Sequence, residues 1–481
     1  MDISSAALNF KLIAPEIVLL AVGMLILLLG NFIRNRAALA YVTVAGFIVA
    51  LILAVQQWNS PQTGFFGMVL IDNFSVLFNI IFIIAGILTV LMARGYLTAR
   101  GIEIFEFYPL MLFCTVGMMV MASSSDLIVI FIGLEIMSVP LYVLAGLARN
   151  DLESNESSMK YFIMGAFASA FLLYGIALIY GAAETTDLRR IVTDFDFIML
   201  NAKIFLIPGA FMVLFGFAFK VAAVPFHMWV PDVYQGAPTP VPGFFSVAPK
   251  AAGFAALLRI FIYGFPPMAD LTPILWIIAV LTMSVGNLLA IFQPNIKRML
   301  AYSSIAHAGY ILVALTAGGD GAVSSALYYL TAYTFFNLGG FAIITMIDSR
   351  SGSRARLDEM KGLSGRHPFL AALLALFMFA LAGFPPTAGF FGKFYVFSEA
   401  VKQGYIWLVI IAVMNSFVSV YYYLRVVVVS YFGKTDEEFK PVVLNPALIL
   451  VLLITAAGTL LLGVLPGYWL ELTRMCTFPF I

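Results

Sequence analysis

Runs of about 20 apolar residues recur along the whole chain, and each is long enough to cross roughly 30 Å of hydrocarbon as a helix. Of the 481 residues, 62% are hydrophobic and 11% are charged, whereas a soluble domain carries about 25% charged residues. The runs lack the strict alternation of barrel strands, and a backbone in lipid must satisfy its own hydrogen bonds. The sequence therefore predicts an all-α polytopic membrane protein with about 14 transmembrane helices.

Two of these runs, the seventh and the twelfth, are longer than one crossing and are interrupted by Pro225 at 222–225 and by glycine and proline at 383–389. Ordinary proline kinks are one explanation. The other is an inverted repeat, because the interruptions lie five runs apart and an odd number of helices per unit reverses its orientation. Paired broken helices of this kind point to a polar site at the membrane midplane.

The inverted repeat divides the chain into four parts. We expect three N-terminal transmembrane helices in 1–104, a first repeat of helices 4 to 8 in 105–263, a second, inverted repeat of helices 9 to 13 in 264–430, and a C-terminal transmembrane helix with its tail in 431–481. In each repeat, one helix is broken: helix 7 in the first and helix 12 in the second.

Basic residues in the loops predict the orientation. They concentrate on one side when the N-terminus is placed outside, and the positive-inside rule assigns that side to the cytoplasm. Both termini then face away from the cytoplasm, and the basic loop 349–366 faces it. The first apolar run lacks the flanks of a removable signal peptide, so we expect it to be retained.

Charged residues inside the apolar runs single out the candidate site. Lys220 precedes the first interruption, Lys393 follows the second, Lys250 lies near the middle of the eighth run, and Glu135 is the acidic residue placed centrally in a run. A charge at the bilayer centre costs about 2.5 to 3.5 kcal/mol, which a purely structural role rarely justifies. Static buried ion pairs are the alternative, but a single central carboxylate cannot neutralise three lysines.

The chemistry of these residues suits proton transfer. Removing a lysine from water favours loss of its proton, whereas a nearby carboxylate favours keeping it. We therefore predict that Glu135 and Lys220 form a switchable pair, that Lys250 is the next proton acceptor, and that Lys393 is the last station before the exit. A protein built in this way moves protons or another small cation.

Other polar residues are weaker candidates. Lys160 either joins the relay or extends to the membrane interface, and His227 and His307 each either shuttle protons or are hydrogen-bonded structural histidines. We expect Arg259 and Arg425 to extend to the interface from the ends of their runs.

Three tyrosines and the cysteines complete the inventory. Tyr421 to Tyr423 are expected in the interfacial aromatic belt. Cys114 and Cys476 are isolated, so they cannot hold an iron–sulfur cluster or a structural zinc ion within this chain.

The glycine clusters lie inside apolar runs, which excludes a dinucleotide-binding loop. The net charge of +1 suggests no nucleic acid partner. Whatever drives cation movement is therefore bound elsewhere.

Several segments carry a family resemblance. Residues 220–241, KVAAVPFHMWVPDVYQGAPTPV, resemble the seventh-helix signature of the antiporter-like subunits of respiratory complex I. The Leu134-Glu135 pair, NIKRMLAYSS at 295–304 and GFFGKFY at 389–395 agree in order. The resemblance covers essentially the whole chain and is strongest to the subunit N family of bacterial NADH:quinone oxidoreductase, whose plastid and cyanobacterial equivalent is subunit 2.

The resemblance implies a 14-helix membrane-arm subunit, in which Glu135, Lys220, Lys250 and Lys393 match the family's proton-conducting axis. It implies that this chain holds no cofactor or metal. NADH, FMN, iron–sulfur clusters and quinone would be bound by neighbouring subunits, and the partners would be other membrane-arm subunits and the lipid bilayer. The expected location is the bacterial inner membrane, with the thylakoid membrane as the alternative.

Two other functions compete with this interpretation. A subunit of a multi-subunit Na⁺/H⁺ antiporter would share the lysine and glutamate pattern, but the segment 234–238 favours complex I. A structural or assembly subunit that transports nothing would carry apolar residues at the lysine positions.

Overall fold

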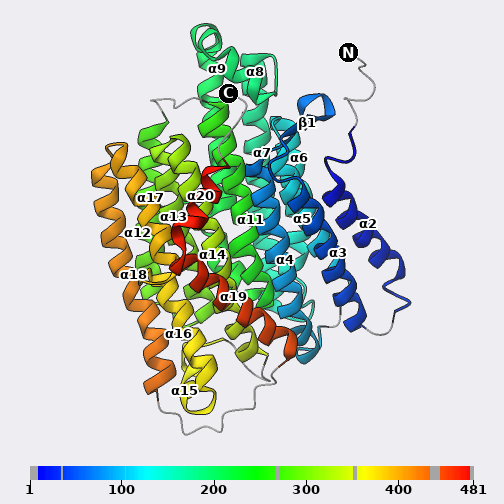
Figure 1. Ribbon diagram of the computed structural model, residues 1–481, viewed down its shortest axis with the longest axis vertical. Helices are drawn as coiled ribbons and strands as arrows, with labels where there is room; N and C mark the ends of the chain where they lie inside the picture. The colour runs from blue at the N-terminus through cyan, green and yellow to red at the C-terminus, as the bar shows by residue number, and fades with distance from the viewer. Residues whose placement is uncertain are drawn as a thin grey trace.

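A computed structural model describes residues 9–33, 36–102, 104–265, 271–349, 355–433 and 445–476. Helices run along the long axis of the molecule, with α8 at one end and α15 at the other (Figure 1). Within the described residues, 11 helices are long and apolar enough to cross a membrane, and three shorter apolar helices accompany them. The all-α membrane fold is confirmed, whereas the total of about 14 crossings remains a prediction.

The elements before the second predicted repeat are α2 (Ala14–Leu29), α3 (Arg36–Gln56), β1 (Gln62–Gly64), the 3₁₀ helix η1 (Phe65–Gly67), β2 (Val69–Ile71), α4 (Asn73–Ala99), α5 (Phe107–Ser123), α6 (Leu127–Ala145), α7 (Leu152–Ala183), α8 (Leu188–Thr193), α9 (Phe195–Val221), α10 (Trp229–Gly236), α11 (Pro240–Leu258) and the π-helix η2 (Arg259–Gly264). The two strands form an antiparallel hairpin in which Gln62 pairs with Ile71.

The remaining elements are α12 (Thr272–Ile291), α13 (Ile296–Ala317), α14 (Gly319–Asp348), the 3₁₀ helix η3 (Leu357–Met360), α15 (Leu363–Arg366), α16 (Pro368–Ala382), α17 (Ala388–Lys402), α18 (Ile406–Phe432), α19 (Pro446–Val464) and α20 (Pro466–Arg474). The predicted cytoplasmic loop 349–366 contains residues 350–354, which lie outside the described part of the chain.

Both predicted interruptions are present. Helix α9 ends at Val221, where Ala222 adopts a left-handed conformation with φ of 65°, and α10 begins only at Trp229. Helix α16 ends at Ala382, followed by Gly383 with φ of 89°, and α17 begins at Ala388. Prolines lie within both gaps and cannot donate a helical hydrogen bond. The assignment of the two broken helices to equivalent, inverted units stays a prediction.

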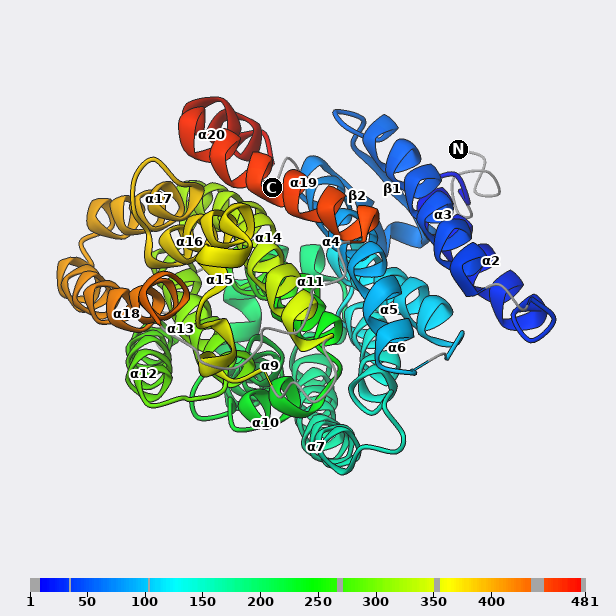
Figure 2. The same cartoon turned by 90° about the horizontal axis from the view of Figure 1, so that it is seen from below.

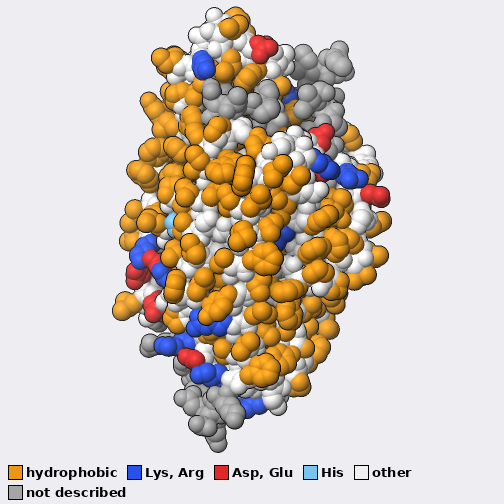
Figure 3. All heavy atoms as spheres, turned by 90° about the vertical axis from the view of Figure 1, so that its left-hand side faces the viewer, with side chains coloured by type: hydrophobic (Ala, Val, Ile, Leu, Met, Phe, Trp, Pro, Cys, Tyr) orange, Lys and Arg blue, Asp and Glu red, His pale blue; other side chains and the backbone are white. Residues whose placement is uncertain are grey.

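The core of the bundle is formed by α11, α13 and α14, which are buried along nearly their whole lengths. Figure 2 shows α11 and α14 in the middle of the bundle and α2, α3, α7, α12 and α18 at its rim. The outer helices leave large apolar side chains exposed, and hydrophobic side chains cover most of the face in Figure 3. Such an apolar exterior suits a lipid environment.

A buried ion pair ties the N-terminal helices to α11. Arg259 in η2 is fully buried, and its guanidinium donates hydrogen bonds of 3.2 and 3.1 Å to the two carboxylate oxygens of Asp72 and one of 2.9 Å to the carbonyl of Ala122. Asp72 in turn caps α4 by accepting from the backbone of Ser75 at 2.8 Å. The expectation that Arg259 extends to the membrane interface was therefore wrong, because its guanidinium forms an ion pair with the buried carboxylate of Asp72 inside the bundle.

The interfacial location expected for three tyrosines was also wrong for two of them. Tyr422 and Tyr423 are buried, whereas Tyr421 is 59% exposed. On a helix, consecutive residues point about 100° apart, so three adjacent tyrosines cannot all face lipid.

Candidate functional site

Three of the predicted site lysines are buried within the bundle. Lys220, Lys250 and Lys393 are 5%, 3% and 5% exposed. Among the described residues, none of the three has a carboxylate within ion-pair distance. The site is therefore a set of buried amines whose charges are met by aromatic faces, backbone carbonyls and hydroxyls.

Lys220 lies in the last turn of α9, beside the first break. Its Nζ atom is 5.3 Å from the ring centroid of Tyr142 and 5.4 Å from that of Tyr161, and it has no hydrogen-bond partner among the described residues. Tyr161 is fixed by stacking on Trp229, with ring centroids 4.3 Å apart. The negative faces of aromatic rings attract a cation. The rings therefore stabilise the ammonium of Lys220 without accepting a conventional hydrogen bond from it.

Glu135 on α6 does not contact Lys220 directly. Its carboxylate accepts a hydrogen bond of 2.5 Å from the hydroxyl of Ser169 on α7, and the residue is only half-buried. Tyr142 lies two turns further along α6, on the same face as Glu135, and its ring is one of those that contact the lysine. The predicted pair is thus separated, with the carboxylate held by a serine.

Lys250 and His307 approach the same turn of α13. The ammonium of Lys250 donates a hydrogen bond of 2.6 Å to the carbonyl of Ser304, three residues before His307. The ring of His307 lies between two hydroxyls, with Nδ1 at 2.7 Å from Tyr329 and Nε2 at 3.0 Å from Tyr423. His307 is therefore both buried and hydrogen-bonded through its two ring nitrogens.

Lys393 on α17 reaches back across the second break. Its Nζ atom donates to the carbonyls of Ala382 and Leu381 at 2.8 and 3.3 Å, and to the hydroxyl of Ser416 on α18 at 2.9 Å. The ring of Tyr310 lies 5.0 Å from the same atom. The carbonyls at a helix C-terminus carry partial negative charge, which suits the binding of a cation at the end of α16.

Two of the weaker candidates, Lys160 and His227, lie apart from the buried lysines, whereas His307 lies beside Lys250. Lys160 is half-exposed and forms ion pairs with Glu156 at 2.7 Å and Asp232 at 2.6 Å. Asp232 also binds Arg298 at 2.6 Å, so the cluster joins α7, α10 and α13. His227 lies between α9 and α10, and no hydrogen bond joins its side chain to the buried lysines within the described residues.

Several polar residues near the lysines were not predicted. Ser169, Tyr329 and Ser416 have no charge and lie in apolar runs, where single hydroxyls are common. A signal existed on 296–317, because Ser303, His307 and Tyr310 recur at helical spacing and define one polar face.

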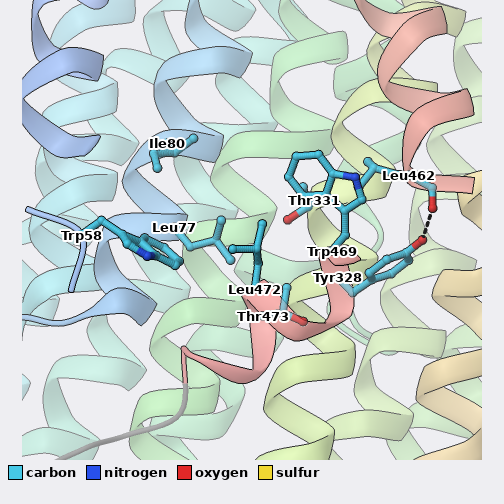
Figure 4. A pocket seen from close by; sticks show the side chains of 9 residues that line it. All are labelled: Trp58, Leu77, Ile80, Tyr328, Thr331, Leu462, Trp469, Leu472 and Thr473. Atoms are coloured by element: carbon cyan, nitrogen blue, oxygen red, sulfur yellow. Dashed lines mark hydrogen bonds between the residues drawn. The ribbon is translucent and has the colours of Figure 1, made fainter. Parts of the chain in front are cut away.

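An apolar cavity of about 220 Å³ lies away from these residues, between α4, α14, α19 and α20. Trp58, Leu77 and Trp469 line it, and Tyr328 at its edge donates a hydrogen bond of 2.6 Å to the carbonyl of Leu462 (Figure 4). None of the candidate proton carriers lines this cavity. Among the described residues, no cluster of histidine, cysteine and carboxylate side chains could hold a metal ion.

Comparison with known proteins places this geometry in a family. Residues 124–419 match the family model described as NADH:quinone oxidoreductase/Mrp antiporter, transmembrane region. The NADH-quinone oxidoreductase subunit N of Trichlorobacter lovleyi is 48% identical, with 98% of this chain and 99% of the relative covered.

Solved structures show the same fold. A chain of respiratory complex I from Thermus thermophilus aligns with a TM-score of 0.81 at 34% identity, covering 95% of this chain and 98% of that one. A chain of the Mrp complex from Dietzia sp. aligns with a TM-score of 0.82 at 22% identity, covering 97% and 96%, which shows a shared fold alone. The chain therefore belongs to the NADH-quinone oxidoreductase subunit N family of antiporter-like membrane proteins.

Proposed function

We propose that this chain translocates protons as a membrane-arm subunit of an NADH:quinone oxidoreductase, driven by electron transfer to quinone in other subunits. The observation that carries the proposal is the burial of Lys220, Lys250 and Lys393 without a carboxylate partner among the described residues. A buried ion without a counter-ion opposes folding by several kcal/mol. Such a cost is explained if the function of these amines is to lose and regain a proton.

The first part of the relay is formed by Glu135 and Lys220. While Ser169 holds the carboxylate, the ammonium of Lys220 faces the rings of Tyr142 and Tyr161, and the carboxylate does not stabilise its proton. When a change in a neighbouring subunit draws Glu135 toward the lysine, the lysine retains its proton. The carboxylate is thus the element that couples proton release to the rest of the complex.

The second part connects Lys250 to Lys393. A proton leaving Lys250 meets the polar face of α13, where His307 lies between the hydroxyls of Tyr329 and Tyr423. Imidazole can accept a proton on one nitrogen and release one from the other. Lys393, bound to the carbonyls at the end of α16, is the last station. Lys160 and His227 are not part of this relay. Lys160 belongs to the ion-pair cluster around Asp232, and His227 lies in the break between α9 and α10.

The two breaks support the division into inverted repeats, residues 105–263 and 264–430. Each break places the C-terminal end of a half-helix, α9 or α16, beside a buried lysine. Transporters with inverted repeats use such half-helix ends to bind cations near the midplane. Residues 1–104 and 431–481 flank the repeats on this proposal.

The same proposal assigns the environment of the chain. We infer a bacterial inner membrane, both termini away from the cytoplasm, and NADH, FMN, iron–sulfur clusters and quinone held by other subunits. A cysteine introduced at Gly365, which is exposed in α15, should resist an impermeant thiol reagent added outside intact cells. Labelling from outside would reverse the orientation.

The decisive experiment measures proton uptake per electron in inverted membrane vesicles at matched enzyme content. Lys220→Ala should lower quinone-linked turnover and the pH gradient, while NADH oxidation by an artificial acceptor stays unchanged. Lys220→Arg should also fail, because a guanidinium does not give up its proton. Lys402→Ala is the control, since Lys402 is exposed and bound to Glu399. Unchanged gradients in Lys220→Ala would overturn the relay.

A further inference from the structure

A second set of buried polar side chains lies along the contact between α11 and α14. It begins at Asp348, the last residue of α14, which is 1% exposed. Its carboxylate accepts hydrogen bonds from Tyr96 at 2.8 Å, from Arg100 at 3.3 Å and from the hydroxyl of Thr239. The side chain of Arg100 is 30% exposed, so this cluster connects the buried carboxylate to the end of the bundle.

The polar contact resumes closer to Lys250. Asn337 on α14 donates a hydrogen bond of 2.5 Å to the hydroxyl of Ser246 on α11. Ser246 precedes Lys250 by four residues, so the two side chains lie on one helix face about 6 Å apart along the axis. The side-chain amide oxygen of Asn337 is fully buried and has no hydrogen-bond partner in the part of the chain that the structure describes.

Between these two clusters lies a short apolar section. A Cβ atom added to Gly243 would lie 3.1 Å from the Cβ of Phe341 and 3.3 Å from the terminal methyl group of Met92. The absence of a side chain at 243 therefore lets α11 and α14 approach closely. Thr345, one turn beyond Phe341, is 1% exposed, and its hydroxyl has no hydrogen-bond partner among the residues that the structure describes.

Helical geometry places these residues on a common seam. Thr239, Ser246 and Lys250 are spaced by seven and four residues, and Asn337, Phe341 and Asp348 by four and seven. Both spacings keep side chains on one face of a helix. The direct bonds from Thr239 to Asp348 and from Asn337 to Ser246 show that the two faces meet.

Helix packing alone does not account for the seam. A buried polar atom without a partner costs about 1 to 3 kcal/mol, and buried polar groups are generally satisfied by protein or ordered water. The hydrogen bond from Asn337 to Ser246 is enough to hold the two helices together. It does not satisfy the side-chain oxygen of Asn337 or the hydroxyl of Thr345. Two such atoms on one seam, on either side of Phe341, mark positions where water can be bound.

We propose that the α11–α14 seam is a proton intake route that carries protons from Asp348 past Thr345 and Asn337 to Lys250. Phe341 packs against Gly243 and forms an apolar section without polar side chains, which limits the rate of proton transfer along the route. The inference rests on the proposed function, because it supplies one of the proposed relay stations. No net chemical change is involved, since each proton passes along hydroxyl, amide and water hydrogen bonds.

The test compares variants of the seam in inverted vesicles carrying the whole complex. Asn337→Leu and Thr345→Val should each slow quinone-linked turnover and proton uptake several-fold and should increase the solvent isotope effect on turnover. NADH oxidation by an artificial acceptor should not change. Asn337→Ser, which keeps a polar group, should recover part of the loss, and so it separates lost polarity from lost volume.

A matched control exists on the same helix. Thr334 is as buried as Thr345, but its hydroxyl donates 2.9 Å to the carbonyl of Leu330, so Thr334→Val should behave like the parent. Lys250→Ala distinguishes the two hypotheses. If Lys250→Ala slows proton uptake and the seam variants do not, the intake route is overturned while the relay stands. If Lys250→Ala also has no effect, both hypotheses fail.

Discussion

The ammonium of Lys393 donates a hydrogen bond of 2.8 Å to the carbonyl of Ala382, the last residue of the preceding half-helix. A lysine from one half of the broken helix thus completes the C-terminal end of the other, whose carbonyls lack intrahelical donors. At the first break, no described residue offers Lys220 such an acceptor. The two breaks therefore hold their lysines differently, one bound to backbone and one surrounded by rings.

This difference predicts that Lys393 has a structural role as well as a proton-carrying one. Lys393→Ala should lower both proton uptake and the thermal stability of the subunit, by about 1 to 3 kcal/mol for the unsatisfied carbonyls. Lys393→Arg should keep more of the stability, because the guanidinium still donates, but should lose proton uptake. Equal stability of the two variants, measured by thermal unfolding, would contradict a role for Lys393 at the helix end.

Ser169 should control how far Glu135 can move. Ser169→Ala removes the hydroxyl that holds the carboxylate at 2.5 Å. A hydrogen bond to a charged group contributes about 1.5 to 3 kcal/mol, so its loss should favour the approach of Glu135 to Lys220 and slow proton release several-fold. Quinone-linked turnover in vesicles measures this effect.

Ser138→Ala is the matched control for Ser169→Ala. Ser138 lies on the same helix as Glu135, but its hydroxyl donates to the carbonyl of Leu134, so its removal should leave turnover unchanged. A slowing as large as that of Ser169→Ala would mean that helix packing, and not the position of the carboxylate, sets the rate.

Tyr423 should matter for proton transfer more than its neighbour. The hydroxyl of Tyr423 lies 3.0 Å from His307 and 2.5 Å from Ser303, whereas that of Tyr422 donates 2.9 Å to Asn287. Each hydroxyl contributes about 1 kcal/mol to stability, so Tyr423→Phe and Tyr422→Phe should unfold at similar temperatures. Proton uptake should fall several-fold only in Tyr423→Phe. The same loss in both variants would argue against transfer through His307.

The main architecture could be predicted from the sequence because hydrocarbon imposes strict rules on it. Apolar length located the helices, and proline located both breaks, with glycine beside it at the second. Lys220, Lys250 and Lys393 were identifiable because charges are rare in apolar runs, and the structure places all three in the interior.

Contacts between distant helices could not be predicted in the same way. Arg259 stands near the end of its run, and the sequence does not show that Asp72, 187 residues away, faces it. Glu135 was expected beside Lys220, but spacing along the chain cannot show that Ser169 on the next helix binds its carboxylate first. Pairing across helices depends on rotation about each helix axis, which a broad apolar face leaves undetermined.

The ion pair of Asp72 and Arg259 should be the strongest single interaction that stabilises the packing of the N-terminal helices against the rest of the bundle. Arg259→Met leaves a buried carboxylate without its partner, which costs about 3 to 5 kcal/mol. Asp72→Asn keeps an oxygen that can cap α4, so the double variant should recover much of that loss. The coupling energy from the double-mutant cycle isolates the ion pair.

Cys476 provides a local readout of this tie. Its thiol is buried, and Asn73, next to Asp72, donates a hydrogen bond of 3.0 Å to the carbonyl of Met475. Thiol labelling of Cys476 should therefore accelerate in Arg259→Met and slow again in the double variant, while buried Cys114 on α5 reports global unfolding. If the double variant labels as fast as Arg259→Met alone, the two charges do not stabilise one another and the tie must come from apolar packing around η2.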